Sequence, residues 1–198
     1  MSQPFNPRDY QRAIIRHMLQ HERCNVWAGM GTGKTVSTLT ALSGLATVVD
    51  PFPVLVLAPL RVASSTWPDE GKKWAHLSGL RIAAWTGTRQ FPRGAVPDIV
   101  TVNYDNAAEL VEHFGDRWPF KTVIADEATR LKGFRVKQGG MRAQALGKVA
   151  HKHVDRFIGL TGTPEQIAAA KFTLEKFIDF CAEQNLDGTE LTAYYFPK

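Results

Sequence analysis

The sequence has few of the features that would place it in a membrane, outside a cell or among disordered proteins. Its 198 residues include only two cysteines, Cys24 and Cys181, with no CxxC pair, which favours a reduced, cytoplasmic setting. No apolar run approaches the ~20 residues that a membrane-spanning helix needs. The first residues are polar and include Pro4 and Pro7, unlike a secretory leader. We therefore expect a cytoplasmic protein that has no membrane partner.

The composition is that of an ordinary globular protein. Hydrophobic residues make up 44% of the chain and charged residues 22%, which is enough to build one buried core. The net charge is +5, from 24 Lys and Arg against 19 Asp and Glu. This excess permits a polyanionic partner such as nucleic acid but does not identify one.

The most informative stretch is AGMGTGKT at residues 28–35, which lies between a short apolar run and a helix-like segment. This order of strand, glycine-rich turn, Lys-Thr and helix is typical of a phosphate-binding loop. Glycines let backbone N–H groups approach a triphosphate, and the following helix directs its positive end at the anion. The expected ligand is therefore a nucleoside triphosphate with Mg²⁺, contacted by Gly29, Met30, Gly31, Thr32, Gly33, Lys34 and Thr35.

Within this loop, Lys34 is expected to bind the β- and γ-phosphates, and the Thr35 hydroxyl to bind Mg²⁺. The general motif begins with glycine, whereas this chain has Ala28. The alternative is a flexible turn that only joins a strand to a helix. The Gly-Lys-Thr ending favours the phosphate loop.

The remaining pattern predicts an α/β fold with a mostly parallel sheet and helices on both faces. Strands are expected at residues 26–27, 54–58, 81–85, 98–104, 122–125 and 156–160. Several are continuous apolar runs, as in parallel strands covered on both faces. Helices are expected at residues 8–20, 36–42, 64–76, 143–150 and 165–184, and from a cap at Asp105 to Phe114, with a turn-rich tail after residue 184.

Asp126 and Glu127 follow one of these apolar strands. Ligands of parallel α/β sheets bind beyond the carboxyl ends of the strands, where the phosphate loop also lies. One of these two carboxylates is therefore a candidate Mg²⁺ ligand, and its neighbour a candidate base for a water that attacks the γ-phosphate. An exposed acidic turn is the alternative reading of this pair.

Several segments, in this order, resemble the first RecA-like domain of superfamily 2 helicases and translocases, most closely the SNF2-type branch found also in phages and bacteria. RDYQ at residues 8–11 resembles the adenine-reading segment, and residues 28–35 resemble motif I, which often begins with Ala in that family. APLR at residues 58–61, together with Trp67, resembles motif Ia, and TVNY at residues 101–104 resembles motif Ib. DEAT at residues 126–129 resembles motif II, and LTGTP at residues 160–164 resembles motif III.

The resemblance implies ATP hydrolysis coupled to movement on nucleic acid, with double-stranded DNA as the expected partner. It implies that Asp126 binds Mg²⁺ together with Thr35, and that Glu127 is the catalytic base. It also implies that Gln11 contacts the adenine base, and that Thr161, Gly162 and Thr163 couple the nucleotide to nucleic acid. The residues expected to face nucleic acid are Arg61, Thr101, Arg130, Lys132 and Arg135. The last three belong to a basic, glycine-containing segment whose alternative reading is a solvated loop.

Two departures from the family limit the expected activity. Residues 1–164 correspond to one RecA-like lobe, whereas residues 165–198 do not continue the family pattern. A motor of this type needs a second lobe, and no Gln-x-x-Gly-Arg-x-x-Arg pattern occurs in the chain. Such an arginine contributes ~10³–10⁵ in rate to related phosphoryl transfers. We therefore expect slow hydrolysis without a second lobe or partner protein.

Two other functions fit parts of the pattern. One is a stand-alone nucleotide- or DNA-binding module that regulates a partner without turnover. The other is a small-molecule or nucleotide kinase, which would have no use for motifs Ia and III. DNA-stimulated ATP hydrolysis, binding without hydrolysis, or phosphate transfer to a small acceptor distinguishes the three.

Overall fold

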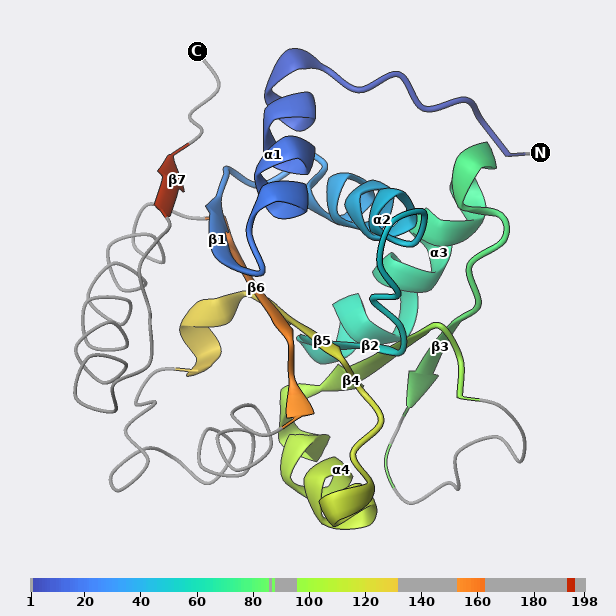
Figure 1. Ribbon diagram of the computed structural model, residues 1–198, viewed down its shortest axis with the longest axis vertical. Coiled ribbons are helices and arrows are strands. Elements are labelled where there is room, and N and C mark those ends of the chain that lie inside the picture. The colour runs from blue at the N-terminus through green and yellow to red at the C-terminus, as the bar shows by residue number, and fades with distance from the viewer. Residues whose placement is uncertain (1, 86, 88–95, 132–152, 163–191, 195–198) are drawn as a thin grey trace.

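A computed structural model describes residues 2–85, 87, 96–131, 153–162 and 192–194. The described chain forms one parallel sheet with helices on both faces, which confirms the expected α/β class (Figure 1). The strand order is β3-β4-β2-β5-β6-β1-β7. The strands are β1 (Arg23–Trp27), β2 (Val54–Ala58), β3 (Ile82–Trp85), β4 (Ile99–Asn103), β5 (Thr122–Asp126), β6 (Arg156–Thr161) and β7 (Thr192–Tyr194).

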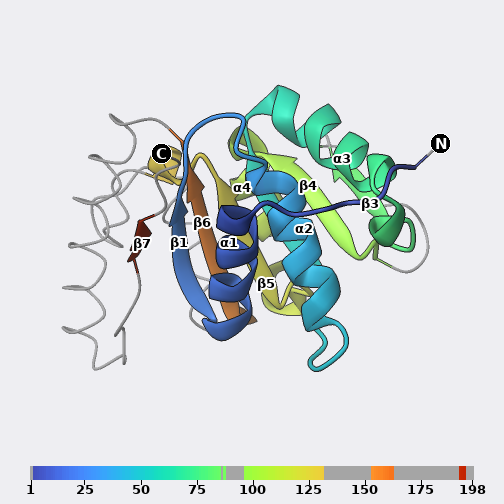
Figure 2. The ribbon, with the colours of Figure 1, turned by 90° about the horizontal axis from the view of Figure 1, so that it is seen from above.

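Helices cover the sheet unequally. Figures 1 and 2 show α1, α2 and α3 on one face and α4 on the other. The α-helices are α1 (Asp9–Gln20), α2 (Lys34–Leu45), α3 (Trp67–Lys73) and α4 (Ala107–Phe114). Short helical turns occupy Val62–Thr66 (π) and, as 3-10 turns, Ala75–Leu77, Tyr104–Asn106, Gly115–Arg117 and Ala128–Leu131.

Strand β2 shows why the sheet needs helices on both faces. Its even-numbered residues, such as Val56, pack into the core beneath α1 to α3, whereas Leu55 and Leu57 pack into the core beneath α4. Every residue of β2 is fully buried. An uninterrupted apolar run is the expected sequence of a strand that is covered on both sides.

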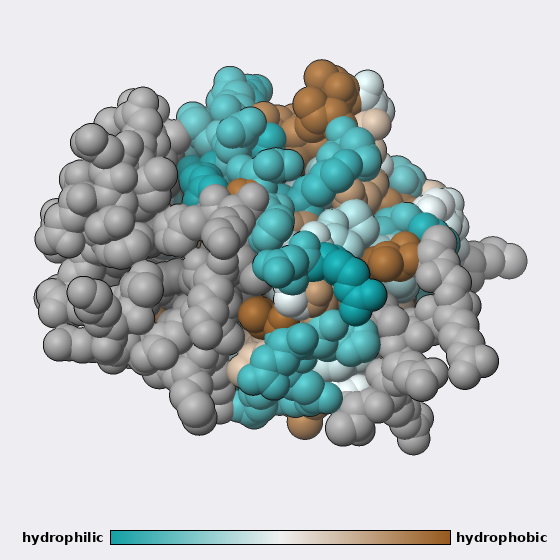
Figure 3. Space-filling model, turned by 60° about the horizontal axis from the view of Figure 1, so that its bottom comes forward, coloured by the Kyte–Doolittle hydropathy of each residue, from teal (hydrophilic) through white to brown (hydrophobic). Residues whose placement is uncertain are grey.

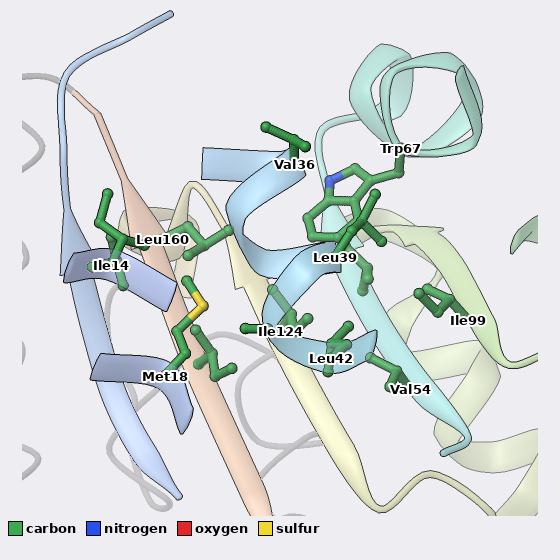
Figure 4. Packing of buried hydrophobic residues seen from close by; sticks show 14 of the residues in the cluster. Ile14, Met18, Val36, Leu39, Leu42, Val54, Trp67, Ile99, Ile124 and Leu160 are labelled. Carbon is green, nitrogen blue, oxygen red and sulfur yellow. The ribbon is translucent and has the colours of Figure 1, made fainter. Parts of the chain in front are cut away.

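The core beneath α1 to α3 positions the helix that follows the phosphate loop. Figure 4 shows Val36, Leu39 and Leu42 of α2 among the buried side chains of this core, with the ring of Trp67 next to Leu39. Leu39, Leu42 and Trp67 have no exposed surface. Close packing of this kind fixes α2, and so fixes the residues at its N-terminus.

The structure corrects three details of the predicted elements. The helix expected over residues 64–76 is divided into the π-helical turn, α3 and a 3-10 turn, with Pro68 in the first turn of α3. The N-cap of α4 is Asn106, because Asp105 lies within the 3-10 turn Tyr104–Asn106, where its carboxylate accepts a hydrogen bond from the Asn103 amide at 3.1 Å. The tail contributes β7, which pairs with β1. The helices expected at residues 143–150 and 165–184 lie outside the described residues.

The described apolar residues are gathered neither in a long helix nor in one large patch on the described part of the face in view in Figure 3. Among the described residues, no helix is long and apolar enough to cross a membrane. Figure 3 shows mainly hydrophilic residues on the described part of the face in view, with hydrophobic residues in small separate patches. Such scattered apolar groups are normal for a protein surface.

Candidate nucleotide-binding site

The phosphate loop joins the end of β1 to the start of α2. Gly31 and Gly33 have φ of 74° and 77°, in the left-handed region that favours glycine. Gly33 is the N-cap of α2, so its conformation sets the direction of the helix. Gly29 is outside the left-handed region, and a Cβ there would lie 3.8 Å from the Thr32 methyl group, an ordinary contact. The backbone thus requires glycine at residues 31 and 33 more strongly than at residue 29.

Lys34 is held at the centre of the site by its own loop. Its Nζ donates to the carbonyl oxygens of Ala28 at 2.8 Å and Gly29 at 2.9 Å. Gly162, which directly follows β6, lies beside the ammonium, because a Cβ there would be 3.0 Å from Nζ. The absence of a side chain at Gly162 therefore makes room for the ammonium.

The Lys34 ammonium and the Asp126 carboxylate lie close enough to interact electrostatically. Burial lowers the pKa of Lys34, and the charges of Asp126 and Glu127 oppose that shift. Burial raises the pKa of Asp126, while the Trp67 hydrogen bond and the Lys34 charge oppose it. The structure thus brings together the lysine and the carboxylates that the sequence places about 90 residues apart.

Asp126 is fixed by residues from two other elements. The Trp67 indole N–H donates to Asp126 Oδ2 at 3.0 Å, and the Tyr104 hydroxyl donates to the Asp126 carbonyl oxygen at 2.8 Å. Both bonds are buried. Sequence reasoning quoted Trp67 and Tyr104 within motifs but missed both contacts. The available signal for these contacts was the general rule that a buried indole or phenol usually has a polar partner.

Glu127 has an unusual backbone and a cationic partner. Its φ of 59° is in the left-handed region, which costs a residue with a Cβ roughly 1–2 kcal/mol. Its carboxylate accepts a hydrogen bond from Arg130 Nε at 3.0 Å, and its carbonyl oxygen accepts one from the Arg130 backbone N–H at 2.9 Å. The strained turn directs the chain from β5 into the 3-10 turn that carries Arg130.

Gln11 lies against the loop that the sequence predicted it to serve. Its Nε2 donates to the Thr32 carbonyl oxygen at 3.1 Å, and its Oε1 accepts from the Arg8 backbone N–H at 2.9 Å. A Cβ on Gly33 would be 2.5 Å from the same Nε2, so Gly33 is required for this contact. Contact between Gln11 and a base stays a prediction.

The two loop threonines differ. The Thr32 hydroxyl donates to the Gly29 carbonyl oxygen at 2.8 Å and stabilises the loop itself. Thr35 is half-buried in the first turn of α2. Among the described residues, no group of three His, Cys, Asp or Glu side chains could hold a metal ion alone. A Mg²⁺ site of one carboxylate, one hydroxyl and nucleotide phosphates needs no such group, so Thr35 and Asp126 fit it.

The residues predicted to contact nucleic acid fall into three sets. Arg61 and Arg130 are exposed, as such a contact requires. The prediction that Thr101 faces nucleic acid is corrected, because its side chain is fully buried and its hydroxyl donates to the Ala63 carbonyl oxygen at 2.6 Å. A side chain that is buried and paired within the protein cannot touch a DNA backbone. Lys132 and Arg135 lie outside the described residues.

The predicted coupling segment touches the phosphate loop directly. Thr161 is buried at the end of β6, and its carbonyl oxygen accepts from the Ala28 backbone N–H at 3.1 Å. Gly162 follows beside Lys34, while Thr163 lies outside the described residues. The structure thus places two of the three residues of the predicted coupling segment next to the phosphate loop.

The parallel sheet, the glycine loop that ends at a lysine and the adjacent acidic pair together define a phosphate-loop nucleotide-binding domain. The sequence matches the family model for DEAD/DEAH box helicases over residues 8–171. The chain therefore belongs to the DEAD/DEAH box helicase family.

Two curated relatives match part of the chain. It is 53% identical over 165 residues to protein p41 of the Acyrthosiphon pisum secondary endosymbiont phage 1, covering 81% of this chain and 36% of that protein. It is 28% identical over 145 residues to the ATP-dependent DNA helicase DDM1 of Arabidopsis thaliana, covering 69% and 18%. The chain thus spans about a third or less of these relatives.

Solved structures agree with the family. The SWI2/SNF2 ATPase core of Sulfolobus solfataricus in complex with dsDNA has a TM-score of 0.63 at 26% identity, covering 81% of this chain and 32% of that one. The same core domain in another structure has a TM-score of 0.60 at 24% identity, covering 90% and 35%, and supports the fold alone. The chain is therefore an SNF2-like RecA-type domain of the superfamily 2 helicases.

Proposed function

We propose that this domain is the ATP-binding lobe of a DNA-dependent ATPase that couples ATP hydrolysis to binding or movement on double-stranded DNA. The observation that carries the proposal is that Lys34, at the start of α2, interacts electrostatically with Asp126 and Glu127 at the carboxyl end of β5. A half-buried lysine near carboxylates suits a ligand that brings both phosphates and a divalent cation.

Each side chain has a role that its position supports. Lys34 binds the β- and γ-phosphate oxygens, and Thr35 and Asp126 hold Mg²⁺. When held there, Mg²⁺ would supply Lewis-acid chemistry at the phosphates. Glu127 orients the attacking water and accepts its proton. The glycine loop directs the α2 N-terminus toward the phosphates, and Gln11 contacts the base.

DNA and a second lobe belong to the same proposal. Exposed Arg61 and Arg130 offer contacts to phosphates, and the similar Sulfolobus ATPase core was solved with dsDNA. Because the chain spans only part of its relatives, we propose that a second RecA-like domain completes the site in trans or in a longer chain. Residues 1–164 form the ATP-binding lobe of that assembly.

The test is a pair of measurements on the 198-residue chain. Binding of a fluorescent ATP analogue is measured first, and phosphate release is then measured with and without duplex DNA, for the wild type, Lys34→Ala and Glu127→Gln. We expect Mg²⁺-dependent binding that Lys34→Ala weakens, and DNA-stimulated release that both substitutions abolish. Failure of the wild type to bind the analogue would reject the proposal.

A regulatory module without turnover is the second candidate, and the Glu127–Arg130 ion pair favours it. The carboxylate that would act as base already accepts the Arg130 hydrogen bond at 3.0 Å. Tight ATP binding with no phosphate release, with or without DNA and second-lobe protein, would support this candidate over the first.

A further inference from the structure

Trp67 contacts the proposed metal ligand although it lies 59 residues away in the sequence. Its ring has no exposed surface, and its Nε1 donates to Asp126 Oδ2 at 3.0 Å. Hydrogen bonds from a neutral donor to a carboxylate are stronger than those between neutral groups. The bond therefore holds the carboxylate in one rotational state within a buried site.

Two further contacts hold Asp126 from other directions. The Tyr104 hydroxyl holds its carbonyl oxygen at 2.8 Å, and the Glu127 backbone N–H donates to its carboxylate. Of these donors, only Trp67 reaches the carboxylate from a different element. Free rotation about an aspartate Cβ–Cγ bond is soft, so a remote donor is needed to fix the carboxylate plane.

Trp67 is itself rigidly held. It is the first residue of α3, directly after the π-helical turn Val62–Thr66, and its ring packs beside Leu39 of α2 (Figure 4). Since α2 begins at Lys34, the same core fixes both the lysine and the donor to the aspartate. Rigid support from outside the ligand set tunes metal sites in other proteins.

We propose that Trp67 is a positioning residue that orients the Asp126 carboxylate for Mg²⁺ in the nucleotide complex. Each carboxylate oxygen has two lone pairs, so Oδ2 can accept the indole N–H while the group still offers acceptor sites to a cation. The inference depends on the proposed function, because it assigns Trp67 to the Mg²⁺ of that site.

The variant that isolates the bond is Trp67→Phe, which keeps a buried ring and removes the N–H. Trp118→Phe is the matched control, because Trp118 Nε1 also donates a buried bond, to the Phe120 carbonyl oxygen at 3.1 Å, in the core beneath α4. Both variants lose an indole hydrogen bond and part of a ring. Only Trp67→Phe alters a bond to Asp126.

The measurement is binding of N-methylanthraniloyl-ATP to the 198-residue chain as Mg²⁺ is titrated. We expect Trp67→Phe to raise the half-saturating Mg²⁺ concentration about 10-fold or more, as outer contacts of metal ligands typically do. Trp118→Phe should stay within about twofold of wild type, and analogue binding in EDTA should be the same for all three. Equal Mg²⁺ dependence in the two variants would mean that Trp67 only fills the core.

A measurement on the wild-type chain covers the case in which Trp67→Phe does not fold. With ¹⁵N-labelled tryptophan, the Trp67 indole resonance is assigned by Phe variants of the other four tryptophans. Addition of Mg²⁺ to the ADP-loaded protein should move the Trp67 resonance and leave that of Trp118 in place. An unmoved Trp67 resonance would overturn the inference, whereas no Mg²⁺-dependent ADP binding would overturn the proposed function instead.

Discussion

The Lys34 ammonium is held by carbonyl groups five and six residues away, whereas the Asp126 carboxylate is held by an indole 59 residues away. The phosphate loop thus builds its half of the site from one continuous stretch. The acidic end of β5 depends on the packing of α3 and on the end of β4. The loop around Lys34, built from local contacts, should tolerate changes in the distant core, whereas the end of β5 around Asp126 should not.

Removal of the loop's charge should have the largest effect. We expect Lys34→Ala to lower the rate of ATP hydrolysis roughly 1000-fold, because a positioned charge at a developing anion contributes about 10²–10³. Phosphate release with saturating ATP and DNA measures the loss. Lys121→Ala, which breaks an exposed ion pair with Asp50 at 2.6 Å, is the control and should leave the rate unchanged.

The acidic half is tested by the strained residue next to Asp126. Glu127→Gly should lower turnover roughly 100-fold, since general bases contribute about 10²–10⁴. The same change relieves the left-handed φ, so the free energy of unfolding should rise by roughly 0.5–1 kcal/mol after the entropy of the new glycine is included. Glu127→Gln should lose turnover without that gain. Urea unfolding distinguishes the two variants.

The contact between β6 and the loop is tested by filling the space at Gly162. An alanine Cβ there would lie 3.0 Å from Lys34 Nζ, and the ammonium would have to shift. We expect Gly162→Ala to weaken ATP-analogue binding about 10-fold, about 1.4 kcal/mol, with little change in stability. Gly79→Ala is the control, because nothing lies within 4 Å of its Cβ position. Equal binding by the two variants would contradict the steric argument.

Thr101 tests whether motif Ib acts through its buried side chain. Thr101→Val removes the 2.6 Å bond to the Ala63 carbonyl oxygen and should cost about 2 kcal/mol of unfolding free energy, because that oxygen is left unpaired. DNA affinity at fixed salt should be unchanged. Arg61→Gln should show the opposite result, with weaker DNA binding and normal stability. Loss of DNA binding in folded Thr101→Val would restore the original prediction.

The smallest effect concerns β1, which leads into the loop. Burial raises the pKa of the Cys24 thiol from 9.0 to about 12. Between these values the unfolded chain releases the proton and the folded chain keeps it, so the free energy of unfolding falls as pH rises. We expect a loss of about 1 kcal/mol between pH 9 and pH 10. Cys24→Ala should flatten this slope in urea unfolding, whatever its effect at pH 7.

The elements that follow from continuous sequence were predicted well. The apolar run at residues 54–58 is β2 with its observed bounds, because turn residues and Pro59 limit it on both sides. The glycine loop and the acidic pair were placed at strand ends by the same local patterns. Tertiary contacts were not readable, because the Trp67 bond to Asp126 and the burial of Thr101 depend on how α3 packs onto the sheet.

The ion pair between Glu127 and Arg130 joins the proposed base to a residue that we propose contacts nucleic acid. The single N–H of Arg130 Nε cannot donate to the Glu127 carboxylate and to a nucleic-acid phosphate at the same time. Any nucleic acid that drew Arg130 outward would leave Glu127 with one cationic neighbour fewer. By thermodynamic reciprocity, a nucleotide complex that drew the Glu127 carboxylate away from Arg130 would free Arg130 to contact a nucleic-acid phosphate.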